Sequence, residues 1–398
     1  MRASLDRFEQ FAIDVILERR YGKRAALLRW LLYALSWLFR GGVQTRLWLY
    51  RHRFLRERAP GVLVISVGNL TVGGTGKTPV VERLARTLKD GGRRVAILSR
   101  GYKAKKPPLL RRLQRKWLGL EKNKSRIVHD GERLLLDSRF AGDEPFMLAK
   151  SLRDVPVVVD KDRVRAALHA VRVLRCDVLI LDDGMQYLTL GRSREVVLVD
   201  CQAPFGNEYL LPRGTLREPP ANLRRAHIII LTKSDGQPQN ALIARIREYN
   251  RTAEIIETTH RPLYLQHLYD EADRRPLDYL SGKFIGAISG IARPESFEGK
   301  LTALGAELLI TKRFADHHRF SDEELREFLD RAVRRDLDFI VTTEKDSVRF
   351  PYTMQNLEVP IYYLRVEIEI LSGHESWAGL VARLCDRQPV GTAERFFA

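Results

Sequence analysis

The segment TVGGTGKTP, residues 71–79, carries residue types that bind the phosphates of a nucleotide. Its glycines can turn successive backbone N–H groups inward around phosphate oxygens, and the Lys77 ammonium can neutralise the β- and γ-phosphates. The Thr78 hydroxyl can ligate Mg²⁺. Such loops usually begin with glycine, but Thr71 is tolerated there unless its φ must be positive. The predicted nucleotide-binding residues of this segment are Thr71, Val72, Gly73, Gly74, Thr75, Gly76, Lys77 and Thr78.

Two acidic residues, Asp182 and Asp183, follow the apolar run VLIL at 178–181. A carboxylate at the end of such a strand holds Mg²⁺ in phosphate-loop NTPases, directly or through water. The alternative is that two acids before Gly184 form an ordinary turn. The segment TKSD at 232–235 resembles the base-reading end of a GTPase, although so short a match is equally compatible with a plain strand end.

The elements that must position these residues alternate between strands and helices. Apolar runs of strand length lie at 61–70, 93–102, 155–162, 176–184, 195–201 and 227–235, and helical patterns lie at 80–92, 141–152 and 163–174. This alternation predicts a parallel sheet with helices on both faces and ligands at the carboxyl ends of the strands. We therefore predict an α/β fold built on a parallel sheet like that of phosphate-loop NTPases.

A chain of 398 residues is long enough for more than one domain. We predict an N-terminal basic and apolar helical segment at 1–58, a phosphate-loop core at 59–235 with a basic insertion at about 103–128, and a smaller C-terminal α/β lobe at 236–398. In the C-terminal lobe, Ser321 and Glu324 have the spacing of a capping box at a helix start. The three cysteines are widely spaced, which favours reduced thiols over a zinc site.

The net charge of +18 is concentrated in two stretches. Residues 1–60 carry 13 Lys and Arg against 5 Asp and Glu, and residues 101–128 carry 10 against 1. The run 25–39 is apolar but shorter than the ~20 residues that span a bilayer. In 107–120, Leu and Trp recur at helical spacing opposite arginines, which suits an anionic membrane surface. The alternative is a buried N-terminal helix and a solvated basic insertion. Because no RNP, KH or helix-turn-helix pattern accompanies the charge, we predict no nucleic-acid partner.

Nine short motifs, in sequence order, resemble those of the tetraacyldisaccharide 4'-kinase family of lipid A biosynthesis. They are VGNLTVGGTGKTP (67–79), LSRGY (98–102), GDEP (142–145), LDDGMQ (181–186), LLPRGTLREP (210–219), TKSD (232–235), SGIARPESF (289–297), FADHH (314–318) and TTEKD (342–346). The loop that begins with threonine is part of this resemblance. The resemblance implies a peripheral or monotopic, ATP- and Mg²⁺-dependent lipid kinase on the cytoplasmic face of the bacterial inner membrane. Its acceptor is the 4'-hydroxyl of an acylated glucosamine disaccharide 1-phosphate, and its product is lipid IVA.

The resemblance also implies roles for individual residues. Lys77 and the base Asp143 are catalytic, and His317, or alternatively His318, is the partner of Asp143. By residue type alone, Asp143 could equally be the N-cap of the following helix. Arg217 is implied to steady phosphate charge. The implied Mg²⁺ set is Thr78, Asp182, Asp183 and Glu218.

Two functions of other classes remain as alternatives. One is a phosphate-loop ATPase acting as a membrane-associated conformational switch, although such ATPases carry a lysine early in the loop, where Thr71 and Val72 stand. The other is a basic nucleic-acid-binding protein with a vestigial loop. Its charge would line a groove and would not accompany apolar helices.

Overall fold

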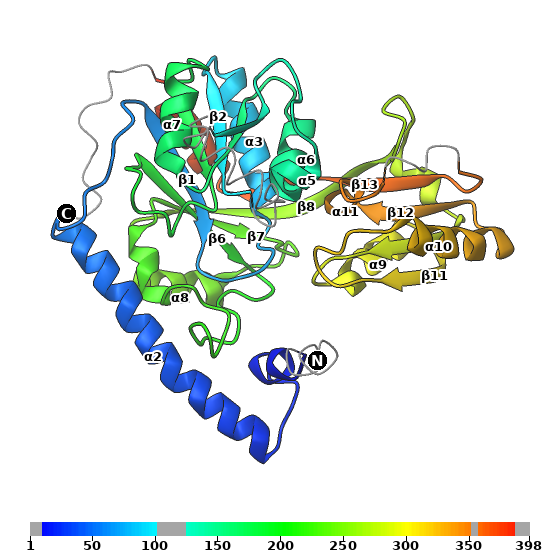
Figure 1. The fold of residues 1–398 in the computed structure, drawn as a ribbon, viewed down its shortest axis with the longest axis horizontal. Helices are drawn as coiled ribbons and strands as arrows, with labels where there is room; N and C mark the ends of the chain where they lie inside the picture. The colour runs from blue at the N-terminus through cyan, green and yellow to red at the C-terminus, as the bar shows by residue number, and fades with distance from the viewer. Residues whose placement is uncertain (1–9, 102–124, 352–356, 387–398) are drawn as a thin grey trace, which may run out of the picture.

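The computed structural model describes residues 10–101, 125–351 and 357–386 of the chain (Figure 1). Most of the basic insertion predicted at about 103–128 lies outside the described residues. The amphipathic helix predicted at 107–120 lies outside them entirely.

The N-terminal half is built on a mainly parallel sheet. Its parallel strands, in order across the sheet, are β7 (Ile228–Thr232), β6 (Arg194–Asp200), β1 (Leu63–Asn69), β5 (Val178–Asp182), β2 (Val95–Ser99) and β4 (Val157–Val159), and β3 (Arg126–His129) is antiparallel at the edge. Every residue of β5, β2 and β7 is buried, as expected for parallel strands that are covered on both faces. The predicted phosphate-loop fold is confirmed.

Helices cover both faces of this sheet. The helices α3 (Lys77–Asp90) and α6 (Asp143–Ser151) pack their apolar residues against one face, in a cluster that includes Leu84 and Phe146. The helix α7 (Arg163–Arg172) packs against the other face through Val164 and Ala167. α8 (Asn240–Tyr249) contributes Ile246 to a further cluster beside β6 and β7. The helices predicted at 80–92, 141–152 and 163–174 correspond to α3, α6 and α7.

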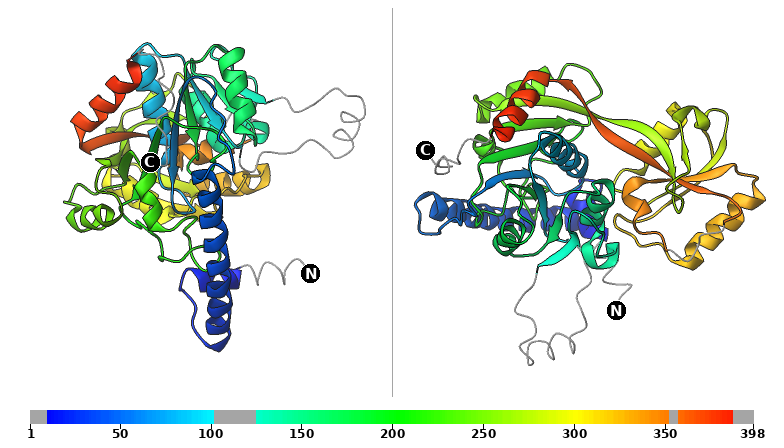
Figure 2. Two further views of the ribbon diagram at one scale, coloured as in Figure 1. Left: turned by 90° about the vertical axis from the view of Figure 1, so that its left-hand side faces the viewer. Right: turned by 90° about the horizontal axis from the view of Figure 1, so that it is seen from above.

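Two long strands connect the N-terminal half to the C-terminal half. β8 (Glu254–His267) pairs in parallel with β7 at its start and antiparallel with β13 (Ile361–Ser372) along the rest of its length. β13 in turn pairs in parallel with β12 (Phe339–Thr343), which is followed across the sheet by β10 (Phe284–Ser289) and β11 (Glu307–Arg313). One sheet therefore runs through both halves, and the β8–β13 ribbon is the bridge between them (Figure 2).

The C-terminal half carries helices on both faces of its strands. α10 (Asp322–Arg334) packs Leu325 and Phe328 on one face, and α9 (Pro294–Ala303) packs Phe297 and Leu301 on the other. The predicted capping box at the start of α10 is confirmed, because the Ser321 side chain accepts from the Glu324 N–H and the Glu324 carboxylate accepts from the Ser321 N–H. The short helix α11 (Glu344–Ser347) follows β12.

The last described helix, α12 (His374–Cys385), lies in the N-terminal half. Leu380 and Leu384 join the apolar cluster of α3, and Trp377 packs against the same cluster. The N-terminal half is thus completed by a helix that follows the C-terminal half in sequence. The domain bounds given above remain a prediction.

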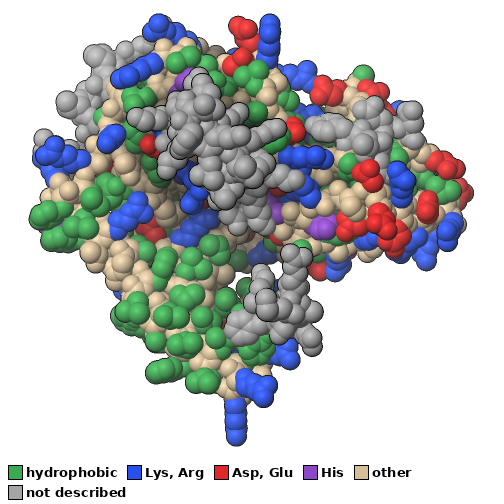
Figure 3. Space-filling model, in the orientation of Figure 1, with side chains coloured by type: hydrophobic (Ala, Val, Ile, Leu, Met, Phe, Trp, Pro, Cys, Tyr) green, Lys and Arg blue, Asp and Glu red, His purple; other side chains and the backbone are tan. Residues whose placement is uncertain are grey.

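The helix α2 (Lys23–Arg51) extends along the outside of the N-terminal half (Figures 1 and 2). It contacts the rest of the molecule through Ser36, whose hydroxyl donates to the Leu210 carbonyl at 2.9 Å, and through Leu47 and Tyr50, which pack on Leu188. Its large apolar side chains are mostly exposed: Leu27, Trp30, Leu31, Tyr33, Leu35, Trp37, Leu38 and Trp48. Hydrophobic side chains gather on the lower part of the molecule in Figure 3, where α2 lies in the same orientation in Figure 1. No helix among the described residues has both the length and the apolar character that a membrane crossing requires.

Candidate active site

The phosphate loop connects the end of β1 to the start of α3. Gly76 is the N-cap of α3 and has φ 75°, and a β-carbon there would lie 2.9 Å from His260 Nε2. Both features require glycine. Thr71 does not have a positive φ, so the backbone at this position accepts a residue with a β-carbon. It forms a bridge with Leu216, and the Val72 N–H donates to the Thr215 carbonyl at 2.8 Å. The loop is therefore fixed at its first residues by the segment that leads to Arg217.

The end of β7 supports the loop from the other side. The Thr232 hydroxyl donates to the Thr75 carbonyl at 2.9 Å, and the Lys233 ammonium donates to the Gly74 carbonyl and pairs with Asp200 at 2.6 Å. Lys233 also has a positive φ of 57°. The TKSD segment thus lies against the phosphate loop, and whether it contacts a nucleotide base remains a prediction.

Lys77 points toward the ends of β1 and β5. Its ammonium lies 3.1 Å from Asn69 Oδ1 and 3.6 Å from Asp183 Oδ1, and its side chain is largely buried. A buried ammonium with one amide and one carboxylate beside it retains donors that a phosphate can use. The structure thus brings Lys77 and the acidic end of β5, which were predicted for separate roles, close together.

The pKa values of the neighbouring Asp182 and Asp183 are displaced in opposite directions. Burial, reinforced by Glu144 and Asp183, raises the pKa of the Asp182 carboxyl to about 7, and Ser99 donates a 3.0 Å hydrogen bond to it. Burial also acts to raise the pKa of Asp183, but Lys77 and Arg217 outweigh it and the net pKa lies below the ordinary value. Arg217 Nη1 is 2.8 Å from both Asp183 oxygens. Lys77 and the Ser99 hydrogen bond offset the burial of the Asp182 carboxylate only in part.

The Glu218 carboxylate is buried and bound by other side chains. Its carboxylate accepts from Arg225 at 2.6 Å, Asn222 at 2.7 Å and Gln186 at 3.1 Å. Gln186 also donates to the Asn69 carbonyl, so Glu218 is connected to the site through that amide. Among the described residues, no three His, Cys, Asp or Glu side chains converge as a set of metal ligands. The predicted ligands are therefore not assembled as one group.

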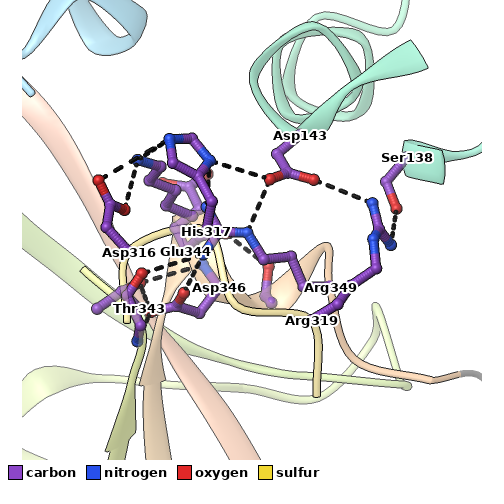
Figure 4. Close-up of polar contacts among 12 residues, drawn as sticks. Ser138, Asp143, Asp316, His317, Arg319, Thr343, Glu344, Asp346 and Arg349 are labelled. Carbon is purple, nitrogen blue, oxygen red and sulfur yellow. Dashed lines mark hydrogen bonds and ion pairs between the residues drawn. The ribbon is translucent and has the colours of Figure 1, made fainter. Parts of the chain in front are cut away.

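Asp143 is the first residue of α6, and its side chain points away from the helix (Figure 4). Gly142 is the N-cap, so the N-cap reading of Asp143 is wrong. One carboxylate oxygen, Oδ2, accepts from Arg349 Nε at 2.8 Å and lies 3.3 Å from His317 Nδ1. The other, Oδ1, accepts from Arg319 at 3.1 Å. Burial raises the pKa of Asp143, but the hydrogen bond to His317 and the charges of Arg349 and Arg319 bring the net pKa below its ordinary value.

The two histidines of FADHH have different surroundings. His317 faces Asp143, and Lys345 lies 3.5 Å from its Nε2. His317 has a φ of 68°, a left-handed backbone conformation that non-glycine residues adopt uncommonly. His318 pairs with Glu324 at 2.9 Å and stacks on Phe314. The geometry therefore selects His317 over His318 as the neighbour of Asp143.

Sequence reasoning missed the arginines of this group. Arg349 is fully buried and bonds Asp346 at 2.7 Å, three residues before it, while its Nε reaches Asp143 in the other half. Arg319 comes directly after FADHH. Both arginines lie just outside the family motifs FADHH and TTEKD. A single arginine outside a motif has no sequence pattern that would mark it as part of the site.

Comparison with known proteins agrees with this geometry. A family model described as tetraacyldisaccharide-1-P 4'-kinase matches residues 28–385. A tetraacyldisaccharide 4'-kinase of Elusimicrobium minutum (strain Pei191) is 38% identical over 350 residues, covering 86% of this chain and 88% of the relative. One of Anaeromyxobacter dehalogenans (strain 2CP-C) is 40% identical over 341 residues, covering 84% and 85%.

One solved structure is similar to this chain over the whole length of the solved chain. It is described as the "apo" form of LpxK from Aquifex aeolicus in complex with ATP, and it has a TM-score of 0.70 and 30% sequence identity. It covers 90% of this chain, and this chain covers all of it. The fold, the motifs and the relatives agree, and the chain belongs to the tetraacyldisaccharide-1-P 4'-kinase family.

Proposed function

We propose that this chain transfers the γ-phosphate of ATP to the 4'-hydroxyl of a tetraacyldisaccharide 1-phosphate, giving lipid IVA, at the cytoplasmic face of the inner membrane. Its family establishes the class of reaction, an ATP-dependent 4'-kinase of lipid A biosynthesis. The observation that supports the proposed residue roles is the Asp143–His317 pair. It joins a carboxylate of the half that carries the phosphate loop to an imidazole of the other half.

In the proposed step, the 4'-oxygen attacks the γ-phosphorus in line with the leaving group. A new P–O bond forms, the bond from the γ-phosphorus to the β–γ bridging oxygen breaks, and its electron pair leaves with ADP. The hydroxyl proton passes to Asp143, which is ionised at neutral pH because its pKa lies below the ordinary value. A weak base suffices, since the transition state of phosphoryl transfer is loose and positioning supplies most of the catalysis. His317 orients the carboxylate.

Lys77 and Arg217 supply fixed positive charge beside the phosphates. Both contact Asp183 in this structure, so that carboxylate holds them in place at the phosphate loop. Asp182 and Thr78 are the residues that would hold Mg²⁺, and the high pKa of Asp182 fits a site that expects a cation. When bound, the metal neutralises phosphate charge. Glu218 acts through Gln186 and Arg225 and not as a direct ligand.

The acceptor is an acylated lipid, and α2 offers an apolar surface for it. Trp30 and Leu38 are 69% and 73% exposed, and both lie on α2 near its contact with Leu210. Leu210 belongs to the segment that continues to Arg217. Peripheral binding of α2 to an anionic membrane would thus hold the lipid headgroup near the phosphate loop. We propose no nucleic-acid partner.

The alternative, an ATPase that works as a conformational switch, is not favoured. A switch needs water as its acceptor, whereas the matched family is named for transfer to a sugar hydroxyl.

The test is transfer of label from [γ-³²P]ATP to tetraacyldisaccharide 1-phosphate in detergent micelles with Mg²⁺. We expect labelled lipid with the intact chain and none with Lys77→Ala. Lys283→Gln is the matched control, because Lys283 pairs with Asp338 on the surface of the C-terminal half. Release of inorganic phosphate without labelled lipid would contradict the proposal and support the switch.

A further inference from the structure

Two arginines bind the same carboxylate, Asp143, but they are anchored differently (Figure 4). The Arg349 side chain is 0% exposed, and its Nη1 is fixed by Asp346 at 2.7 Å and by the Gly290 carbonyl at 3.1 Å. Its position is determined by the C-terminal half. Arg349 therefore presents a rigidly held donor to Asp143 Oδ2.

Arg319 is held much more weakly. It lies between β11 and α10, its side chain is 37% exposed, and its donors reach Asp143 Oδ1 at 3.1 Å and Ser138 Oγ at 3.2 Å. Only the arginine of this pair is substantially exposed, since the Asp143 side chain is 11% exposed, and solvent around the guanidinium weakens the pair. Because Arg349 already positions Asp143, a structural reason for the second arginine is weak.

Arg319 lies beside the Asp143 oxygen that can bind the acceptor hydroxyl. Oδ2 already has Arg349 Nε at 2.8 Å and His317 Nδ1 at 3.3 Å, so Oδ1 is the oxygen with capacity for the substrate hydroxyl. A hydroxyl bonded to Oδ1 would lie about 2.7 Å from it. The Arg319 guanidinium, which binds that same oxygen, is then adjacent to the attacking oxygen and to the phosphoryl group that this oxygen receives.

We propose that Arg319 is a further catalytic residue, which turns from Asp143 and Ser138 onto the transferred phosphoryl group and stabilises its charge in the transition state. The guanidinium comes from the C-terminal half, whereas Lys77 comes from the N-terminal half. Arginine suits this contact because its planar donors match phosphate oxygens. The same movement leaves Oδ1 open to the hydroxyl proton. This inference rests on the proposed role of Asp143, and the test is arranged to separate the two.

Kinetics of Arg319→Gln and Arg319→Lys test the contact. We expect kcat to fall about 10²- to 10³-fold for Arg319→Gln, the loss typical of removing one donor to a developing charge, with KM for both substrates changed less than about threefold. Arg319→Lys should keep part of the lost activity because it keeps the charge. The matched control is Arg335→Gln, an exposed arginine of the same half that donates to the Leu309 carbonyl. It should leave kcat unchanged.

A binding measurement gives an independent readout. ADP with aluminium fluoride mimics the planar phosphoryl group, so Arg319→Gln should weaken its binding in the presence of the lipid acceptor while binding of ADP alone stays the same. An unchanged kcat, or a higher KM with kcat unchanged, would overturn the proposal.

The variant Asp143→Asn separates this inference from the base assignment. If Arg319 contacts the phosphoryl group, Arg319→Gln lowers kcat further in the Asp143→Asn background. If the double variant equals Asp143→Asn alone, Arg319 acts only through the carboxylate and the proposal is wrong. Wild-type activity of Asp143→Asn would instead remove the base assignment, and the Arg319 measurements would still stand by themselves.

Discussion

At the residue scale, the three aspartates of the site have pKa values that are displaced in opposite directions. Burial raises that of Asp182, while neighbouring cations lower those of Asp183 and Asp143. Environments that separate the pKa values of similar groups usually mark different chemical tasks. The environment of Asp182 suits binding of a metal cation, and that of Asp143 suits acceptance of a proton.

We predict that Asp182→Asn stabilises the metal-free protein while abolishing transfer. Burial raises the folded-state pKa of Asp182 from 3.8 to about 7, so the folded protein binds the extra proton between these pH values and loses stability as the pH rises through that window. Asparagine removes this cost. In EDTA, the variant should have a higher Tm than the wild type at pH 8, and the difference should shrink toward pH 4. A difference that does not change with pH would show that the charge of Asp182 is not responsible.

We predict that Asp143→Ala and His317→Ala are strongly non-additive in kcat. Groups that work as one unit lose most of their effect with the first deletion, and these two lie 3.3 Å apart. The double variant should be about as slow as the slower single variant. His318→Ala provides the control, because His318 pairs with Glu324 and its effect should multiply with that of Asp143→Ala. Multiplying losses for His317 as well would mean that the pair does not act together.

Part of the site could be read from the sequence, and part could not. The loop at 71–79, the acids at 182–183 and the family motifs are local patterns whose spacing reflects one turn or one strand end. The contact of Arg349 with Asp143 joins residues that are 206 positions apart, and nothing near either residue indicates it. Glu218 was predicted as a Mg²⁺ ligand, and its buried partners Arg225 and Asn222 could not be inferred from its motif.

At the scale of elements, the helix α2 combines an apolar exposed surface with few contacts to the rest of the chain. Burial of side chains such as Trp30 and Leu38 in a membrane interface gains roughly 25 cal/mol per Å² of apolar area, and nearby Lys and Arg add about 1 kcal/mol each against anionic lipid.

The predicted strands were located within a few residues because period and composition are local signals. The pairing of β8 with β13 was not predicted, because strands so distant in sequence carry no mark of their partnership.

We predict that the double variant Trp30→Glu, Leu38→Glu floats poorly with liposomes that contain anionic lipid. Two charges placed on the apolar surface of α2 oppose its insertion, whereas the wild type should float well at low salt and less at high salt. Val173→Glu is the matched control, since Val173 is an apolar residue of 61% exposure next to α7 and away from α2. Equal flotation of the two variants would show that α2 is not the membrane contact.

At the scale of the whole molecule, one arginine connects the two halves at the bridging strands. Arg365 of β13 binds Glu82 of α3 and Glu344 of α11, and it donates to the Ser151 hydroxyl at 3.2 Å. These four residues lie on the phosphate-loop helix, the bridge, the C-terminal half and α6. The relative position of the phosphate loop and the His317 loop therefore depends partly on this ion-pair group.

We predict that Arg365→Met destabilises the protein by about 3–5 kcal/mol, because it removes the cation of the largely buried Glu344 and leaves the buried Glu82 with Arg86 alone. Urea unfolding measures the loss. Adding Glu82→Gln and Glu344→Gln should restore part of it, since the amides remove the unpaired charges. A change below about 0.5 kcal/mol for Arg365→Met, the size of an ordinary surface substitution, would show that the group contributes nothing to the connection.

The return of α12 to the N-terminal half affects the order in which a ribosome can complete this protein. Domains generally fold as their residues emerge during synthesis. The apolar cluster around α3, however, includes Leu380 and Leu384, so the chain must be synthesised through these residues before that cluster can close. The helix α2 leaves the ribosome before any residue of that cluster and is apolar on its outside. We therefore expect the nascent chain to reach its membrane before its catalytic half has folded, so that the enzyme becomes active only where its lipid substrate already is.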